Sequence, residues 1–284
     1  MRVAIFGATG LLGKALMQKW KGDEVIGFGS ADADIRNEQQ VADTVEQIRP
    51  DWVVLAAGYT DVDGCESDPD RAFTMNCHGA SIVAQAAKHC AAKLLFISTD
   101  YVFDGKKTEP YETTDPRAPR SVYGKTKADA EVQLLEILPD VCIMRTSWMY
   151  GVGGKCFPDT ILKLAGKKPE LDVVNDQRGC PTYTVDLSRA IMQLCRADAK
   201  GIVHVTNSGD CTWYDFALEI IAACELPTII RPTTSDKFIR PAERPKYSVL
   251  SANSAQQYGV QMPGWRDALH RYLTEREALK ITTK

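Results

Sequence analysis

The chain has 284 residues, with 34 basic and 37 acidic side chains and a formal net charge of -3. Hydrophobic residues make up 44% of the sequence and charged residues 25%, which is typical of a folded globular protein and excludes a mainly disordered chain. The lack of a basic excess argues against a nucleic-acid-binding protein, and no apolar stretch reaches the roughly 18 residues that a membrane span needs. The length predicts one or two domains.

The first 150 residues alternate between strand and helix patterns. Short apolar runs predict strands at 2–6, 24–28, 52–57, 93–98 and 141–147. Helices are predicted between them, over 11–20, 41–48, 71–90 and 121–136. Apolar strands that alternate with helices form a parallel sheet covered on both faces, and right-handed crossovers wind it in two directions. We therefore expect an α/β fold with a doubly wound, Rossmann-like parallel sheet.

After residue 150 this alternation loosens. Strands are predicted at 171–174 and 201–205, and helices at 185–195 and 213–224. The stretch from Pro227 to Pro245 is too rich in proline for a regular helix. The expected organisation is a dinucleotide-binding domain over 1–150, to which 184–206 also contributes, and a smaller, irregular α/β substrate lobe over 151–284.

The nine cysteines are dispersed, and none forms a CxxC pair. This pattern predicts free thiols in a reducing compartment such as the cytoplasm, and no structural zinc site. The first 16 residues include an early arginine and an apolar run but lack a small-residue cleavage site. We interpret them as a strand, a loop and a helix rather than a signal peptide.

Gly7, Gly10 and Gly13 lie in the segment GATGLLG, directly after the first strand and at the start of the first helix. Glycines in this place let the backbone approach a pyrophosphate and let the helix pack closely on the strand. The helix N-terminus adds free N–H groups and a partial positive charge. The spacing is GxxGxxG rather than GxGxxG, but its position predicts a dinucleotide site. The alternative is a purely structural turn.

The choice of dinucleotide depends on the residues after the second strand. Ser30 stands there, instead of an acid for a ribose 2′-hydroxyl or an arginine for a 2′-phosphate. Ser30 and Lys14 favour the phosphate, whereas Asp32 and Asp34 oppose it, and Asp34 is expected beside the adenine. We therefore expect both cofactors to be used, with a modest preference for NADPH over NADH.

Tyr123 and Lys127 form the YxxxK motif of the chain, on a predicted helix. Residues four apart share one helix face, and an ammonium beside a phenol lowers the phenol pKa from its usual value of about 10. Such a tyrosine can exchange a proton with a reacting oxygen. The alternative is an ordinary Tyr–Lys pair on a helix surface.

A further set of polar residues follows the strand at 93–98. Because ligands bind at the carboxyl edge of a parallel sheet, the hydroxyl of Ser98 or Thr99 could hold the reacting oxygen. Asp100 and Tyr101 could reach polar groups of a substrate. The alternative is a strand end that is merely capped by hydroxyl groups.

Seven motifs together resemble the dTDP-4-dehydrorhamnose reductase family of extended short-chain dehydrogenase/reductases. They cover nearly the whole chain: GATGLLG (7–13), IRPDWVVLAAGYTDVDGCESDP (48–69), STDYVFDG (98–105), APRSVYGKTKADAE (118–131), RTSWMYG (145–151), NDQRGCPT (175–182) and RPKYSVL (244–250). STDYVFDG, and RTSW together with DQxGxPT, are specific to this group. A generic dehydrogenase would share only the glycine loop and YxxxK.

The resemblance implies a role for each matching residue. The catalytic residues would be Thr99, Tyr123 and Lys127. The dinucleotide would contact Gly7, Gly10, Leu11, Leu12, Gly13, Asp34, Ile35, Ala56, Ala57, Gly58, Ser98, Tyr123 and Lys127. The sugar nucleotide would contact Thr99, Asp100, Tyr101, Trp148 and Arg244, with Trp148 as an aromatic wall and Arg244 as a clamp on the diphosphate. Trp148 could instead be a core residue, and Arg244 a solvated one.

The implied reaction transfers a hydride from NAD(P)H to the 4-keto group of a dTDP-6-deoxy-4-keto-hexose, in cell-surface polysaccharide synthesis. A nucleotide sugar, and no nucleic acid or membrane, would be the partner. Some family members bind a metal at a dimer contact, so a homodimer and Mg²⁺ are further implications, but no metal ligands can be assigned here. Ser251 also departs from the Asp or Asn that usually follows RPKYSVL.

Two other functions remain open. The regulatory beta subunit of methionine adenosyltransferase has similar motifs and binds NADP without catalysis, but it has Ser at the position of Thr99 and lacks the RTSW block that includes Trp148. A sugar-nucleotide epimerase or dehydratase would retain its cofactor between half-reactions, but such enzymes are typically longer than this chain.

Overall fold

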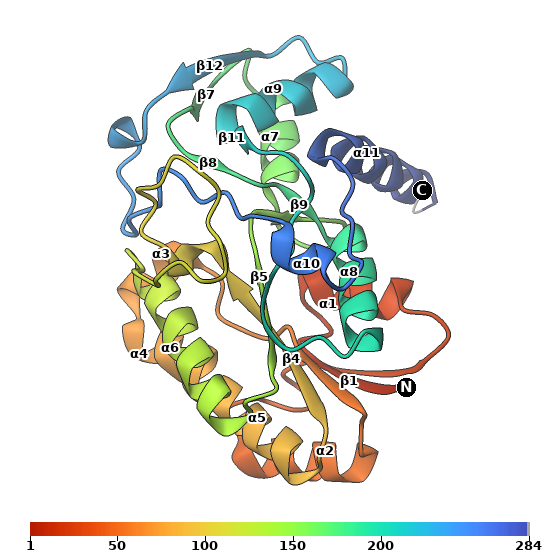
Figure 1. Cartoon of the computed structure of the whole chain (residues 1–284). Helices are drawn as coiled ribbons and strands as arrows, with labels where there is room; N and C mark the ends of the chain where they lie inside the picture. Colours follow the sequence, from red (N-terminus) through yellow and green to blue (C-terminus); the bar gives the residue numbers. More distant parts are fainter. Residues whose placement is uncertain (283–284) are drawn as a thin grey trace.

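A computed structural model describes residues 1–282. Its centre is a six-stranded sheet with the order β10-β5-β4-β3-β1-β2, in which every neighbouring pair is parallel (Figure 1). The strands are β1 (Arg2–Phe6), β2 (Glu24–Phe28), β3 (Trp52–Leu55), β4 (Lys93–Thr99), β5 (Cys142–Thr146) and β10 (Gly201–His204). The strand order reverses beside β1, so the predicted doubly wound parallel sheet is confirmed.

Helices cover both faces of this sheet (Figure 1). Val3 and Ile5 of β1 face α1 (Leu11–Lys19) and α8 (Thr184–Arg196), and these two helices pack on each other. Ala4 and Phe6 face the opposite layer, formed by α2 (Glu38–Ile48), α5 (Gly79–His89) and α6 (Val122–Ile137). Alternate β1 residues therefore enter two separate cores, which explains why the strand is apolar throughout.

The single helix predicted over 71–90 is divided in the structure. It consists of α4 (Pro69–Phe73), a π-helical segment (Thr74–His78) and α5, and a short helix α3 (Val62–Ser67) precedes it. Asn76 in the π-helical segment donates hydrogen bonds to Tyr59 O and Thr126 Oγ1, and it accepts one from Tyr59 N. Such local widening of a helix occurs frequently at functional sites.

The second half of the chain contributes to two regions. It adds β10 and α8 to the central sheet and its helical cover. The rest forms α7 (Phe157–Ala165), α9 (Trp213–Ala223), α10 (Asn253–Gln256), α11 (Trp265–Thr282) and three two-stranded sheets. These sheets pair β7 (Glu170–Val174) with β12 (Ile229–Thr233), β8 (Arg178–Gly179) with β11 (Cys211–Thr212), and β6 (Met149–Tyr150) with β9 (Thr182–Tyr183). Short 3₁₀ turns lie at Asp100–Val102 and Ser235–Lys237.

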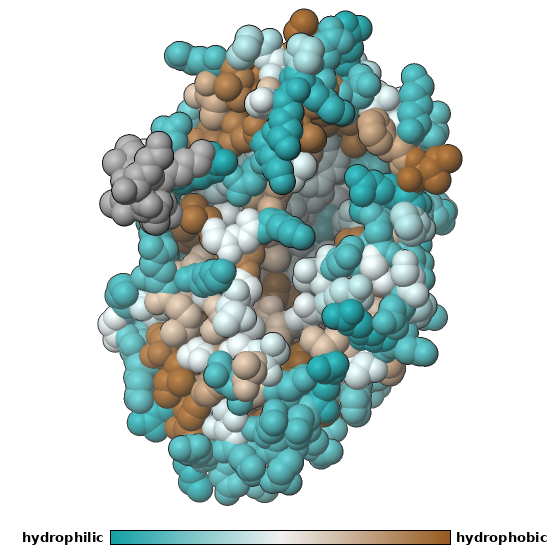
Figure 2. Space-filling view, turned by 180° about the vertical axis from the view of Figure 1, so that it is seen from behind, coloured by the Kyte–Doolittle hydropathy of each residue, from teal (hydrophilic) through white to brown (hydrophobic). Residues whose placement is uncertain are grey.

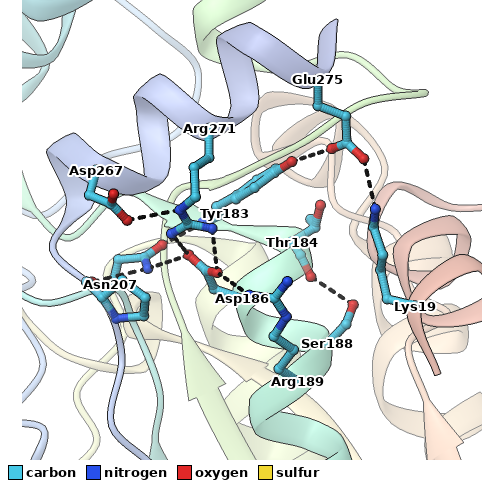
Figure 3. Close-up of polar contacts among 11 residues, drawn as sticks. Lys19, Tyr183, Thr184, Asp186, Ser188, Arg189, Asn207, Asp267, Arg271 and Glu275 are labelled. Carbon is cyan, nitrogen blue, oxygen red and sulfur yellow. Dashed lines mark hydrogen bonds and ion pairs between the residues drawn. The ribbon is translucent and has the colours of Figure 1, made fainter. Parts of the chain in front are cut away.

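A polar network joins α11 to the sheet-covering helices (Figure 3). The buried carboxylate of Asp186 on α8 accepts two hydrogen bonds of 2.7 Å from Arg271 on α11. Glu275 on α11 accepts from Tyr183 Oη and, at 2.9 Å, from Lys19 Nζ on α1. Charged pairs thus connect α1, α8 and α11 on the side of the sheet away from α6.

Candidate active site

The turn between β1 and α1 brings three stretches of backbone into contact. Gly7 has a φ of +90°, and a Cβ atom there would lie 2.5 Å from the backbone nitrogen of Ala57, just after β3. A Cβ atom at Gly13 would lie 2.1 Å from Gly7 O. At Gly10 the nearest atom would be Gly7 O at 3.2 Å. Gly7 and Gly13 are therefore required for packing, whereas Gly10 keeps open the space in front of the α1 N-terminus.

A cavity of about 390 Å³, called the cleft below, lies at the carboxyl edge of the sheet. It gathers residues of the predicted site from the glycine turn, the segment after β3, the end of β4, helix α6 and the segment after β5. They are Gly10, Leu11, Leu12, Ala56, Ala57, Gly58, Ser98, Thr99, Asp100, Tyr101, Tyr123, Lys127 and Trp148. The space-filling view shows a hollow on the face opposite to that of Figure 1, with a mainly hydrophilic rim (Figure 2).

Five other predicted site residues do not line the cleft; Gly7 and Gly13 pack within the glycine turn, and the remaining three lie elsewhere. Ile35 is 3% exposed and packs in the core, where its side chain would meet a Cβ atom at Gly79. Asp34 binds the guanidinium of Arg36 at 2.6 Å, which keeps the Asp34 pKa below its ordinary value. Arg244 binds both carboxylate oxygens of Asp63 on α3, at 3.1 and 3.0 Å.

Tyr123, Lys127 and Thr99 meet where α6 crosses the end of β4. Helix α6 begins after Ser121, whose hydroxyl accepts a hydrogen bond from Gly124 N and caps the helix. The hydroxyl groups of Tyr123 and Thr99 interact. Thr99 Oγ1 also donates to Asp100 Oδ1 at 3.1 Å. The phenol and the hydroxyl group expected to hold a reacting oxygen are thus neighbours in the cleft.

Burial shifts the protonation of these groups. It raises the pKa of Tyr123 above its ordinary value of about 10, which is opposite to the effect that the sequence predicted for a neighbouring lysine. It lowers the pKa of Lys127 to about 7, because a buried ammonium loses its hydration. Lys127 Nζ lies 3.8 Å from the centre of the Phe96 ring, and no hydrogen-bond acceptor for it is found in the described part of the chain.

Asp100 is a buried carboxylic acid of the cleft. It is 2% exposed, and burial raises its pKa to about 7. Its Oδ2 atom is buried and has no hydrogen-bond partner among the described residues. A polar ligand group in the cleft could satisfy this atom, since an unpaired buried oxygen is costly.

An aromatic pair forms the wall of the cleft beyond β5. The ring of Trp148 stacks on Trp213 of α9, with centroids 3.5 Å apart and an angle of 8° between the planes. A Cβ atom at Gly179 would lie 2.7 Å from the Trp148 indole, which explains a glycine in that place. Trp148 has a φ of +45°, which is unfavourable for a residue other than glycine. The packing of its indole ring holds the backbone in this conformation.

Several cleft residues escaped the sequence analysis. They are Thr60, Val62, Asn76, Lys155 and Trp213, among others. The helix at 213–224 was predicted from its apolar period, but nothing in that pattern marks Trp213 as a neighbour of Trp148. For Asn76, the apolar pattern of 71–90 predicts a regular helix and gives no sign of the π-helical segment that turns this side chain to Tyr59.

No group of three or more His, Cys, Asp or Glu that could hold a metal ion occurs in the described part of the chain. Cys224 aside, the other eight cysteines are free thiols, and seven of these eight are buried. Among residues 1–282, no helix is both long and apolar enough to cross a membrane.

Comparison with known proteins places this arrangement in a family. The family model described as RmlD substrate binding domain matches residues 1–278. The chain is 42% identical over 279 residues to the spore coat polysaccharide biosynthesis protein SpsK of Bacillus subtilis, with 98% of each chain covered.

Two solved structures are similar over nearly their whole length. A dTDP-4-dehydrorhamnose reductase from Clostridium acetobutylicum has a TM-score of 0.95 and 38% identity, with 98% of this chain and 100% of that chain covered. The reductase from Bacillus anthracis, solved in complex with NADP, has a TM-score of 0.94 and 38% identity, with 96% of this chain and 99% of that chain covered.

Gly10→Val tests whether the space in front of α1 receives a dinucleotide. We expect the variant to fold, because the first atom of the new side chain has only Gly7 O nearby, and to lose at least about 100-fold in affinity for NADPH. Fluorescence titration with NADPH and a thermal melt measure the two properties. Gly10→Ala is the matched control, with a much smaller loss expected. Unchanged affinity in Gly10→Val would remove the glycine turn from the binding site.

Proposed function

Because the chain belongs to the RmlD substrate binding domain family, we propose that it reduces the 4-keto group of a dTDP-linked 6-deoxy-4-keto-hexose, with NADPH as the hydride donor. It is an oxidoreductase of the dTDP-4-dehydrorhamnose reductase kind, with the Rossmann-like fold of that group. The observation that carries the proposal is the meeting of the glycine turn, Thr99, Tyr123 and Lys127 in one cleft. The proposed product is dTDP-L-rhamnose or a close relative.

The residues of the cleft fit a dinucleotide. Gly10 leaves room in front of the α1 N-terminus, where the backbone N–H groups of Leu11 and Leu12 would face the pyrophosphate. The ammonium of Lys127 has free hydrogen-bonding capacity for ribose hydroxyl groups. Ala56 to Gly58 would lie beside the cofactor.

The proposed chemistry divides between two hydroxyl groups. A bound reduced nicotinamide would supply the hydride to the ketone carbon, and negative charge would develop on the ketone oxygen. Tyr123 Oη donates a proton to that oxygen, and the Thr99 hydroxyl turns from Asp100 to donate a hydrogen bond to it. Since burial raises the Tyr123 pKa, the phenol keeps its proton until the ketone oxygen becomes basic enough to take it.

The substrate side of the cleft would hold the sugar nucleotide. Asp100 and Tyr101 would reach its polar groups, and the stacked pair of Trp148 and Trp213 would contact a sugar or base face. Arg244, which lies beside Tyr101 and is oriented by its ion pair with Asp63, would approach the diphosphate. In this proposal residues 1–150 and 184–206 bind the dinucleotide, and most of 151–284 forms the substrate lobe. A homodimer remains a prediction.

The direct test is NADPH oxidation by the purified protein with a panel of dTDP- and other NDP-4-keto-6-deoxy sugars. We expect turnover with a dTDP sugar, and a loss of roughly 100- to 10,000-fold in the Tyr123→Phe variant, because only the phenolic proton is removed. NADPH binding by the variant serves as the control for its fold. Binding without turnover would favour a regulatory subunit, and sugar conversion without net oxidation would favour an epimerase or dehydratase. More than about a tenth of the wild-type rate in Tyr123→Phe would remove Tyr123 as the acid.

Ser30→Asp tests the preference for NADPH. Ser30 is exposed just after β2, and a carboxylate there would repel a 2′-phosphate. We expect kcat/KM for NADPH relative to NADH to fall about tenfold, which corresponds to about 1.4 kcal/mol. Ser30→Asn, of equal size without charge, should keep the wild-type ratio. The preference for NADPH would be contradicted if this ratio changed equally in both variants, or if kcat/KM of the wild type were at least about 100-fold higher with NADH than with NADPH.

A further inference from the structure

Glu131 is a fully buried carboxylate beneath the cleft to which the proposed chemistry gives no task. Its exposed fraction is 0%, and it accepts from Ser98 Oγ at 2.5 Å. Arg145 donates to its two oxygens at 2.9 and 2.6 Å. Arg117 adds a longer contact of 3.3 Å. Both oxygens of the carboxylate therefore have hydrogen-bond partners, which come from β4, from β5 and from the segment before α6.

Stability alone does not explain this arrangement. Arg145 is 1% exposed, so the pair is wholly removed from water. The free energy needed to remove two charges from water can exceed the attraction between them. Apolar residues of similar size in place of such a pair often give a protein of equal or greater stability. A buried pair of this kind therefore calls for a role in fixing the positions or charges of its neighbours.

The geometry connects Glu131 to the cleft residues. Tyr123, Lys127 and Glu131 follow at intervals of four on α6 and so share one face of that helix. Ser98 and Arg145, which both bind Glu131, are register partners on β4 and β5. Thr99 is the next residue along β4. Glu131 therefore fixes α6 to the sheet one residue before the hydroxyl that Tyr123 contacts.

Charge provides a second connection. The charged group that favours the ammonium form of Lys127 is Glu131 on α6. Burial raises the pKa of the Cys77 thiol in the π-helical segment to about 11, so this neighbour is uncharged where Lys127 titrates. From β4, the Phe96 ring faces the ammonium. His204 beside Arg145 is neutral, because burial and the arginine charge lower its pKa to about 3. Without the Glu131 carboxylate, desolvation would leave Lys127 more easily deprotonated.

We propose that Glu131 is a positioning residue, which holds α6 where Tyr123 meets Thr99 and keeps Lys127 as an ammonium for the dinucleotide ribose. This inference rests on the proposed roles of Tyr123 and Lys127. It assigns to the buried pair a function in cofactor binding rather than in stability.

The test compares NADPH affinity across pH in the wild type and in the double variant Glu131→Gln/Arg145→Met. The double change leaves neither Glu131 nor Arg145 as a charge without its partner, and Gln keeps an acceptor for Ser98. Lys127 loses its proton as pH rises through its pKa, and removal of the carboxylate lowers that pKa. We therefore expect the fall in affinity on raising pH to occur about one pH unit lower in the variant, in addition to a loss of a few-fold at every pH from the broken contacts with β5.

A control is Asp186→Asn/Arg271→Met, which removes an ion pair between the buried carboxylate of Asp186 and the half-buried guanidinium of Arg271, outside the cleft (Figure 3). It should alter the melting temperature but not the pH dependence of binding. If the Glu131 double variant shows the wild-type pH dependence, or a loss that is equal at every pH, the charge role is overturned.

Ser98→Ala keeps the ion pair and removes the 2.5 Å bond between β4 and Glu131, together with any contact of the Ser98 hydroxyl with the dinucleotide, so it provides a test even if the double variant fails to fold. We expect about fivefold weaker NADPH binding at every pH, the equivalent of one hydrogen bond, and unchanged affinity would overturn the positioning role. Since these measurements need no sugar nucleotide, failure of the substrate panel would count against the proposed reaction and not against Glu131.

Discussion

The contact of bare backbone at Gly7 is the constraint on which the cleft depends. The end of β1, the segment after β3 and the first turn of α1 meet there without side chains between them, since a Cβ atom at Gly7 would lie 2.5 Å from Ala57 N and one at Gly13 would lie 2.1 Å from Gly7 O. The contact lies where the strand order reverses, beside β1. It therefore sets the N-terminus of α1 at the point where a doubly wound sheet opens to a ligand.

The rest of the site is built outward from this turn by long-range contacts. Glu131 ties α6 to the ends of β4 and β5, which brings Tyr123 and Lys127 to Thr99. Beyond β5, the stacked indoles of Trp148 and Trp213 join the cleft to the lobe that contains α9. This crowding buries Asp100 and Lys127, and lost hydration is the main cause of their altered pKa values.

The sequence was informative wherever local pattern decides structure. The apolar runs predicted the strands of the sheet, and the position of Gly7, Gly10 and Gly13 predicted the turn, because periodicity and glycine chemistry act over a few residues. It was less informative where distant segments decide. Ile35 lies in the core, Arg244 is paired with Asp63, and the Tyr123 pKa is raised and not lowered, because each depends on neighbours that only the fold supplies. The ion pair of Glu131 with Arg145 escaped for the same reason.

The measurement that most directly tests reduction in this cleft follows the hydride itself. NADPH carrying deuterium at both C4 positions of the dihydronicotinamide ring would be supplied with a dTDP-6-deoxy-4-keto-hexose, and the product analysed by NMR and mass spectrometry. We predict one deuterium at C4 of the sugar for each NADPH oxidised. Deuterium at another carbon, or sugar conversion without net NADPH consumption, would contradict the proposed reaction.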